Sequence, residues 1–136
     1  MKLEYPSKII LAWSEAVKGN KKIRDWLMKN GYPELGIFTF ALHNQDESVK
    51  WLFDNDHPHL AALAIGASGK VDALTWLRKY NLDILEKVAL VADNDEFALH
   101  WLVKQGYKEF ATLGLQMRLV KNQIDMDNND PHRISG

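Results

Sequence analysis

The stretch that decides the fold is "TWLRKYNLDIL", residues 75–85, because close variants of it recur along the chain. The variants are "DWLMKNGYPEL" (25–35), "KWLFDNDHPHL" (50–60) and "HWLVKQGYKEF" (100–110). A Trp–Leu pair therefore returns every 25 residues. Self-similarity at a fixed period of roughly 20–50 residues is the signature of a repeat protein, so we interpret the period before any single element.

Two columns of turn-forming residues keep the same period. The first column contains Gly19, Asn44, Gly69 and Asn94, and the second contains Gly31, Asp56, Asn81 and Gly106. These residue types tolerate the left-handed backbone that ends a helix. The columns cut each repeat into two segments of about a dozen residues, which are too long and too rich in Ala, Leu and Lys for strands. Each repeat is therefore predicted to be helix–turn–helix.

Signals for helix starts agree with this division. Pro33 and Pro58 stand where a first helical position tolerates proline. The sequences "NQDE" (44–47) and "DNDE" (93–96) have the spacing of a capping box that opens the second helix. Helices this short are marginal alone, so they must pack side by side. We expect an all-α protein, an α-solenoid of about four and a half helix–turn–helix repeats.

Apolar columns mark the expected core. Leucine follows each repeated tryptophan, and the first helices carry a matching apolar column, namely Trp13, Phe38, Leu63, Val88 and Leu113. We expect the repeated tryptophans to pack between neighbouring repeats. The alternative is an exposed aromatic ladder that stacks bases or sugars. It is less favoured because the neighbouring residues are mostly apolar, whereas such ladders are interleaved with basic residues.

The segment "LAALAIGASGKVDALTWLRKYN" (60–81) resembles the two helices of the ankyrin repeat. Gly69 and Asn81, like Gly19 and Gly31, have the 12-residue separation of that family's two helix-ending glycines. An ankyrin unit has about 33 residues, and the residues missing here are those of its β-hairpin. The family's "TPLH" opening is also absent. The resemblance covers roughly residues 10–120. It implies a protein that binds other proteins through the inner face of its first helices, without the hairpin half of that surface.

Composition bounds the class of protein. The 136 residues are 46% hydrophobic with net charge −1, which suits one globular domain and predicts no strong attraction to nucleic acid or membrane. The absence of cysteine excludes disulfides and thiolate metal sites. We find neither a signal peptide nor an apolar run of membrane-spanning length, and expect a cytoplasmic protein. Residues 1–122 are predicted to form the solenoid domain. Residues 123–136 are predicted to form a polar, flexible tail with a turn at Asp130–Pro131.

No motif indicates catalysis or metal binding. His57 and His59 flank a proline at a helix start, where their side chains do not converge on one ion, so we expect surface or capping histidines. Acidic residues at the inter-helix turns are explained by capping. The stretch "GASGK" (66–70) lacks the spacing of a phosphate loop. We therefore expect no catalytic residue, no metal and no cofactor, which means that the protein is not an enzyme.

One polar column on the first helices is the candidate partner-binding site: Lys18, His43, Ser68, Asp93 and Arg118. Its mixed charge favours a protein or peptide partner over a polyanion. The row four residues earlier is small throughout: Ser14, Thr39, Ala64, Ala89 and Gly114. That row is either the floor of a concave surface or a set of positions where helices approach closely.

The function that follows is a non-catalytic protein–protein interaction module that binds its partner along a concave face. The tail is predicted to occupy that groove in the free protein. The alternative function is nucleic-acid binding through the basic segment "KGNKKIR" (18–24), which is disfavoured because the polar column alternates in sign. The sequence does not indicate an oligomeric state.

Overall fold

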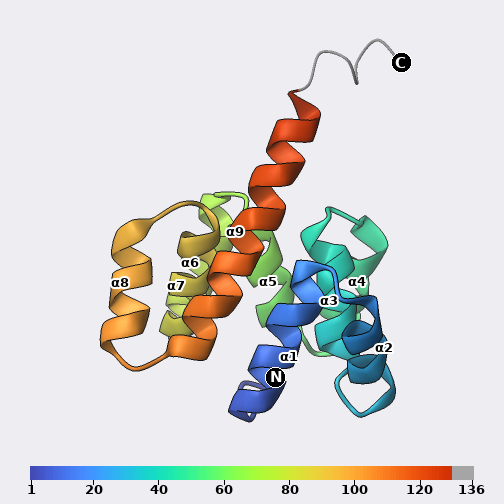
Figure 1. Cartoon of the computed structure of the whole chain (residues 1–136). Coiled ribbons are helices and arrows are strands. Elements are labelled where there is room, and N and C mark those ends of the chain that lie inside the picture. The colour runs from blue at the N-terminus through green and yellow to red at the C-terminus, as the bar shows by residue number, and fades with distance from the viewer. Residues whose placement is uncertain (130–136) are drawn as a thin grey trace.

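The computed structural model describes residues 1–129, which form nine α-helices and no strand (Figure 1). The first helices of the pairs are α1 (Ser7–Lys18), α3 (Pro33–Leu42), α5 (Pro58–Gly66), α7 (Asp83–Ala92) and α9 (Lys108–Asn128). The second helices are α2 (Lys21–Lys29), α4 (Asp46–Asp54), α6 (Val71–Lys79) and α8 (Glu96–Lys104). From α4 onward, each helix starts 25 residues after its counterpart in the preceding pair. The all-α prediction is confirmed for the described residues.

The two turn columns do what their residue types predict. All eight positions have a positive φ, from 58° at Asn81 to 120° at Gly19. Four of the eight are not glycine, and all four are Asn or Asp, the residue types that adopt this conformation at least cost. The backbone at these positions ends one helix and starts the next.

The predicted capping boxes are wrong. Asn44 has a φ of 63° and Asp93 is the C-cap of α7, so both belong to the end of the preceding helix. The N-cap of α8 is Asp95, whose side chain accepts a 3.0 Å hydrogen bond from the backbone N–H of Ala98. The residue with positive φ, Asn44 or Asn94, belongs to the turn. The N-cap of the second helix is therefore the residue that follows it, Gln45 or Asp95.

The inner helices form a closed ring. Helix α9 lies between α1 and α7 and packs against both more extensively than any other two helices pack together (Figure 1). The order around the ring is therefore α1, α3, α5, α7, α9 and back to α1. We call these five helices the inner ring. Each of the outer helices α2, α4, α6 and α8 packs on the two inner helices that flank it in the sequence.

The centre of the ring is filled by the predicted apolar column: Trp13, Phe38, Leu63, Val88 and Leu113. Each of these side chains is at most 1% exposed, and the rings of Trp13 and Phe38 meet edge to face with centroids 5.1 Å apart. The inner faces of the first helices therefore form the packed centre of the molecule. The concave binding face that we expected along them is not available in the described part of the chain.

The row of small residues is also buried, which decides between its two interpretations. A Cβ atom at Gly114 would lie 2.9 Å from the Val91 side chain and 3.3 Å from the Val88 carbonyl oxygen. Small side chains here let α9 approach α7 closely. The row is a set of close-packing positions and not the floor of an open surface.

Leucine, not tryptophan, supplies the core position of the outer helices. The four leucines that follow the repeated tryptophans are fully buried: Leu27, Leu52, Leu77 and Leu102. Trp26 is 49% exposed, and the other three repeated tryptophans are half-buried at the edge of the core. Adjacent residues of a helix point about 100° apart, so only one member of each Trp–Leu pair can face the inner ring. The predicted inter-repeat core role of the tryptophans is corrected accordingly.

Helix α9 extends beyond the ring (Figure 1). It continues to Asn128, so residues 123–128 are helical where we expected the start of a flexible tail. The remainder of that predicted tail, with its turn at Asp130–Pro131 and its proposed docking in a groove, lies outside the described residues. Within residues 1–129, no helix has the length and apolar character needed to cross a membrane.

The Trp–Leu pairs make a first prediction. Leu27→Ala removes a fully buried side chain and should lower the free energy of unfolding by about 2–5 kcal/mol. Trp26→Ala removes a larger side chain that is half in solvent, and should cost less than half as much. Urea unfolding followed by circular dichroism measures both. Equal costs would show that the tryptophan is a core residue after all.

The close approach of α9 makes a second prediction. Glycine-to-alanine changes inside a helix usually stabilise it by about 1 kcal/mol. Gly114→Ala should instead destabilise the protein by about 1–3 kcal/mol, because the new methyl group overlaps Val91 and forces α9 away from α7. Thermal and urea unfolding measure whether this substitution lowers or raises the free energy of unfolding. A variant more stable than the unmodified protein would contradict the prediction, because it would mean that α9 can move outward without losing stabilising contacts with α7.

Candidate functional site

The predicted polar column lies at one end of the ring. The inner helices all point in the same direction, because each outer helix returns antiparallel between them. Lys18, His43, Ser68 and Asp93 therefore lie together around the C-terminal ends of α1, α3, α5 and α7. Helix α9 continues through this end of the ring and divides the four residues into two pairs.

Lys18 and His43 line an open cavity of about 410 Å³ between the end of α1 and the protruding half of α9. We call this cavity the α1–α9 groove. Val17 and Gly19 complete the α1 side, and the α9 side is formed by Gln116, Leu119, Val120, Gln123, Ile124 and Asp127. Leu119 is 63% exposed, and Met126, on the same half of α9, is also mostly exposed. The groove is therefore an apolar surface open to solvent.

A second cavity of about 270 Å³ adjoins the groove and shares Val17, Gly19 and His43 with it. Its far side carries Lys21 and Arg24. Lys18, Lys21 and Arg24 of the basic segment therefore form a basic rim at the apolar groove, which the sequence did not indicate.

Arg24 is held in place at this rim. Its guanidinium lies over the Phe40 ring, 4.8 Å from the ring centroid, and its Nε is 3.4 Å from a carboxylate oxygen of Asp25. Its Nη2 lies 3.4 Å from the same oxygen of Asp25, so the planar guanidinium is fixed by the ring and the carboxylate at the edge of the cavity that Arg24 lines.

Ser68 and Asp93 lie on the other side of α9. They line a cavity of only about 60 Å³ together with Lys121, Asn122 and Asp125. That volume suits a water molecule or two and no peptide. The structure therefore does not bring Ser68 and Asp93 into the α1–α9 groove.

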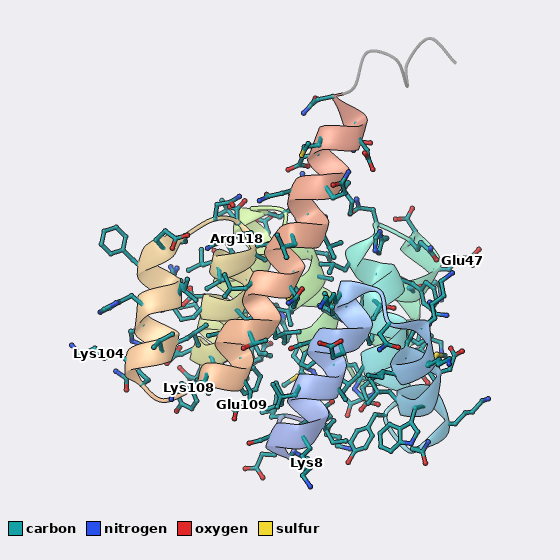
Figure 2. The ribbon with its side chains drawn as sticks, in the orientation of Figure 1. Lys8, Glu47, Lys104, Lys108, Glu109 and Arg118 are labelled. Atoms are coloured by element: carbon teal, nitrogen blue, oxygen red, sulfur yellow. The ribbon has the colours of Figure 1, made fainter. Side chains whose placement is uncertain are left out.

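Arg118 faces α7 and α8 (Figure 2). Its Nε donates a 2.8 Å hydrogen bond to the Val91 carbonyl oxygen, and its Nη1 lies 2.7 Å from a carboxylate oxygen of Glu96. These contacts attach α9 to its neighbours. The role of Arg118 in partner binding stays a prediction.

Lys121 is a buried cation that the sequence analysis did not single out. Its Nζ donates a 3.4 Å hydrogen bond to the Leu42 carbonyl oxygen at the end of α3. Burial lowers the pKa of Lys121, while the carboxylate of Asp125 raises it. Burial and the nearby charge of Lys121 lower the pKa of His43, so the imidazole at the groove is neutral at neutral pH.

The N-terminal segment, residues 1–6, crosses the opposite end of the ring. The Tyr5 hydroxyl donates a 3.1 Å hydrogen bond to a carboxylate oxygen of the buried Glu34. The Nε2 atom of His59 donates to the Lys2 carbonyl oxygen at 2.7 Å. Burial raises the pKa of the Tyr5 phenol, and the negative charge of Glu34 raises it further.

The two neighbouring histidines differ from our expectation of surface or capping residues. His59 is buried beneath the N-terminal segment. His57 precedes α5, and its ring stacks on Trp51 with centroids 6.0 Å apart and lies 3.9 Å from Glu34. Among residues 1–129, no group of three or more His, Asp or Glu side chains is placed to hold a metal ion.

Comparison with protein-family models, with curated proteins and with solved structures found no match to this chain.

The sequence contained a signal for the α1–α9 groove that we did not use. Leu119 and Gln123 are four residues apart and so lie on one face of a helix. Val120 and Ile124 lie beside them. From the sequence we instead predict a polar, flexible tail from residue 123 onward, because that segment carries many polar residues.

The buried His59 makes a third prediction. Burial lowers its pKa to about 4, whereas an unfolded chain takes up the proton near its ordinary pKa of about 6.5. The unfolded state then binds more protons, so the stability that neutral His59 contributes is fully present above pH 6.5 and is lost as pH falls toward 4. The loss should reach about 3 kcal/mol.

His59→Gln keeps a donor for Lys2 but cannot titrate. The fall in unfolding free energy between about pH 7 and about pH 4.5 should be smaller in this variant than in the unmodified protein, as urea unfolding would measure. Identical pH dependence in the two proteins would exclude His59 as the titrating group.

Proposed function

We propose that this protein is a non-catalytic interaction module, and that it binds an amphipathic helix of a partner protein in the α1–α9 groove. The observation that carries the proposal is the apolar surface of Leu119, Val120 and Ile124 over an open cavity of about 410 Å³. Single exposed apolar side chains are ordinary, but a contiguous apolar surface beside a cavity is typical of an interaction site.

The shape of the groove suits a helix. Leu119, Val120 and Ile124 line one side of the groove along α9, and Val17 forms an apolar wall opposite. Helix-in-groove recognition uses apolar anchors of the partner at i, i+3 or i+4, and i+7. Such a partner can lie along α9 and insert its anchors between α9 and the end of α1.

The charge of the rim indicates the polar face of the partner. Lys18 lines the groove, and Lys21 and Arg24 line the adjoining cavity, while Asp127 is the acidic residue in the groove lining. His43 is neutral at neutral pH and adds no charge. We infer a partner helix with an apolar face flanked by acidic residues, which the basic rim would orient.

Nucleic-acid binding remains the second candidate, because the same basic residues could contact phosphates. The apolar side chains of Leu119 and Ile124 have no role in phosphate binding. A nucleic-acid groove would also need a longer basic stripe. The protein partner accounts for both the apolar floor and the basic rim.

We further propose that the helix pairs are ankyrin-like repeats without hairpins, and that they form a short solenoid closed by α9. The 25-residue spacing of the helix starts and the left-handed residues in both turns support this relationship. In this proposal the working surface has moved from the inner faces to one end of the array. A cytoplasmic location remains part of the proposal, and rests on the absence of cysteine.

Leu119→Glu tests the proposed function. The probe is a fluorescein-labelled amphipathic peptide of about 18 residues with leucines on one face and glutamates on the other, long enough to form a helix when bound. A second peptide carries lysines in place of the glutamates. The unmodified protein should bind the acidic peptide more tightly, and Leu119→Glu should weaken that binding about tenfold or more in anisotropy titrations.

Phe97→Glu is the matched control, because Phe97 is 90% exposed on the outer helix α8 and does not line the groove. It should bind the acidic peptide normally, and neither change should shift the melting temperature. A duplex oligonucleotide titrated at low and moderate salt serves as the competing probe. Equal peptide binding by both variants, or tight binding of the oligonucleotide alone, would contradict the proposal.

A further inference from the structure

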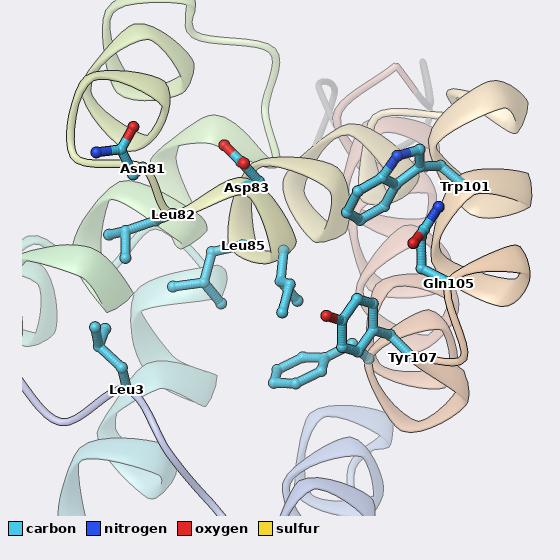
Figure 3. A pocket seen from close by; sticks show the side chains of 10 residues that line it. Leu3, Asn81, Leu82, Asp83, Leu85, Trp101, Gln105 and Tyr107 are labelled. Atoms are coloured by element: carbon cyan, nitrogen blue, oxygen red, sulfur yellow. The ribbon is translucent and has the colours of Figure 1, made fainter.

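A separate cavity of about 460 Å³ lies at the opposite end of the ring, where α7 and α9 begin and α8 ends. This volume is within the range of about 300–1,000 Å³ that is usual for small-molecule sites. Figure 3 shows an aliphatic side and an aromatic side, formed by Leu3, Leu82, Leu85, Trp101 and Tyr107. No residue of this cavity belongs to the α1–α9 groove.

The aromatic side of the cavity is built from one helix and the turn that follows it. Trp101 comes from α8, and Tyr107 comes from the turn before α9. Their rings stack with centroids 6.1 Å apart and an interplanar angle of 28°. Leu82 and Leu85 form the aliphatic side, at the start of α7. A flat ring fits between such walls with apolar surface on both sides.

Three polar side chains at the cavity have no partner of their own. Asn81, Asp83 and Gln105 all line it and are exposed to solvent, and within residues 1–129 none of these side chains makes a hydrogen bond or an ion pair with the protein. Asp83 is the one carboxylate in the lining, and the lining contains no Lys, Arg or His. The cavity therefore combines an aromatic wall with one negative charge that its own residues leave unneutralised.

Two cationic side chains near this end of α7 form ion pairs with a different carboxylate, that of Glu86. Arg78 Nη2 lies 2.7 Å and Lys87 Nζ lies 3.3 Å from the buried carboxylate of Glu86. Lys87 also stands over the Trp101 ring, 5.2 Å from its centroid, which shows that this ring accepts a cation at its face. Because Glu86 holds both cations, Asp83 remains free to attract a positively charged ligand.

We propose that this cavity binds a small aromatic ligand that carries an ammonium group. The ring lies between the leucines and the aromatic side chains, and the ammonium lies beside the Asp83 carboxylate within reach of the Tyr107 face. Burial of the ring provides most of the affinity, while the carboxylate and the aromatic face select the positive charge. The amide groups of Asn81 and Gln105 supply hydrogen-bond partners for polar substituents.

A charge series on one ring system tests the proposal. The probes are 2-naphthylmethylammonium, 2-naphthylmethanol and 2-naphthoate, which share the ring and differ in charge. Binding is followed by amide chemical shifts of the ¹⁵N-labelled protein. Saturable shifts should appear at the starts of α7 and α9, with affinity in the order ammonium, alcohol, carboxylate.

Asp83→Asn should weaken ammonium binding about two- to fivefold, as expected for one exposed carboxylate, and leave alcohol binding unchanged. Asp46→Asn is the matched control, because Asp46 is also the first residue of an exposed helix start and lies outside the cavity. It should leave the charge preference intact. Tyr107→Leu keeps an apolar wall but removes the aromatic face, and should reduce the preference for ammonium over alcohol.

Circular dichroism confirms that each variant is folded before its titration. The proposal is overturned if none of the three probes gives saturable shifts at the cavity. It is equally overturned if the preference for ammonium over alcohol is as large in Asp83→Asn as in the unmodified protein, since the carboxylate would then play no part in selecting the ligand.

Discussion

The packing of α9 between α1 and α7 is the contact on which the rest of the structure depends. Gly114 lets the backbone of α9 approach that of α7. Leu113 and Met117 of α9 project into the centre of the ring, where both are fully buried. Without α9, the inner faces of α1 and α7 would be exposed to water. With it, a row of helix pairs that would have two free edges becomes a ring whose inner apolar faces are covered.

Closure of the ring determines where a ligand can bind. Side chains fill the centre, so the inner faces that an open array would offer to a partner are used for folding. The two ends of the ring remain available for ligand binding, and their side chains differ in chemistry. At one end, α9 extends past the ring and creates an apolar groove with a basic rim. At the other, the N-terminal segment crosses the helix starts beside an aromatic cavity with one free carboxylate.

The local part of this fold could be predicted from the sequence, because it depends on residues near one another in the chain. The left-handed turns at Asn44 and Asn94 follow from residue type and spacing, and the 25-residue period sets the helix starts. The contact of α9 with α1 leaves no periodic signal, since it joins residues about 100 positions apart. For the same reason the sequence placed Lys18 and Asp93 in one column but did not reveal the helix that separates them. The burial of His59 depends on the distant Lys2 and was missed as well.

The same closing contact sets an order of events during synthesis. A linear array can consolidate pair by pair as it leaves the ribosome, since each pair needs only its neighbour. Of the nine described helices, α1 emerges before all the others, and its partner α9 emerges after them. The face of α1 that α9 covers therefore stays exposed until the other helices of the ring have been made, and long-range contacts of this kind form slowly. The nascent chain would expose this face to chaperones for longer than any other part of the fold.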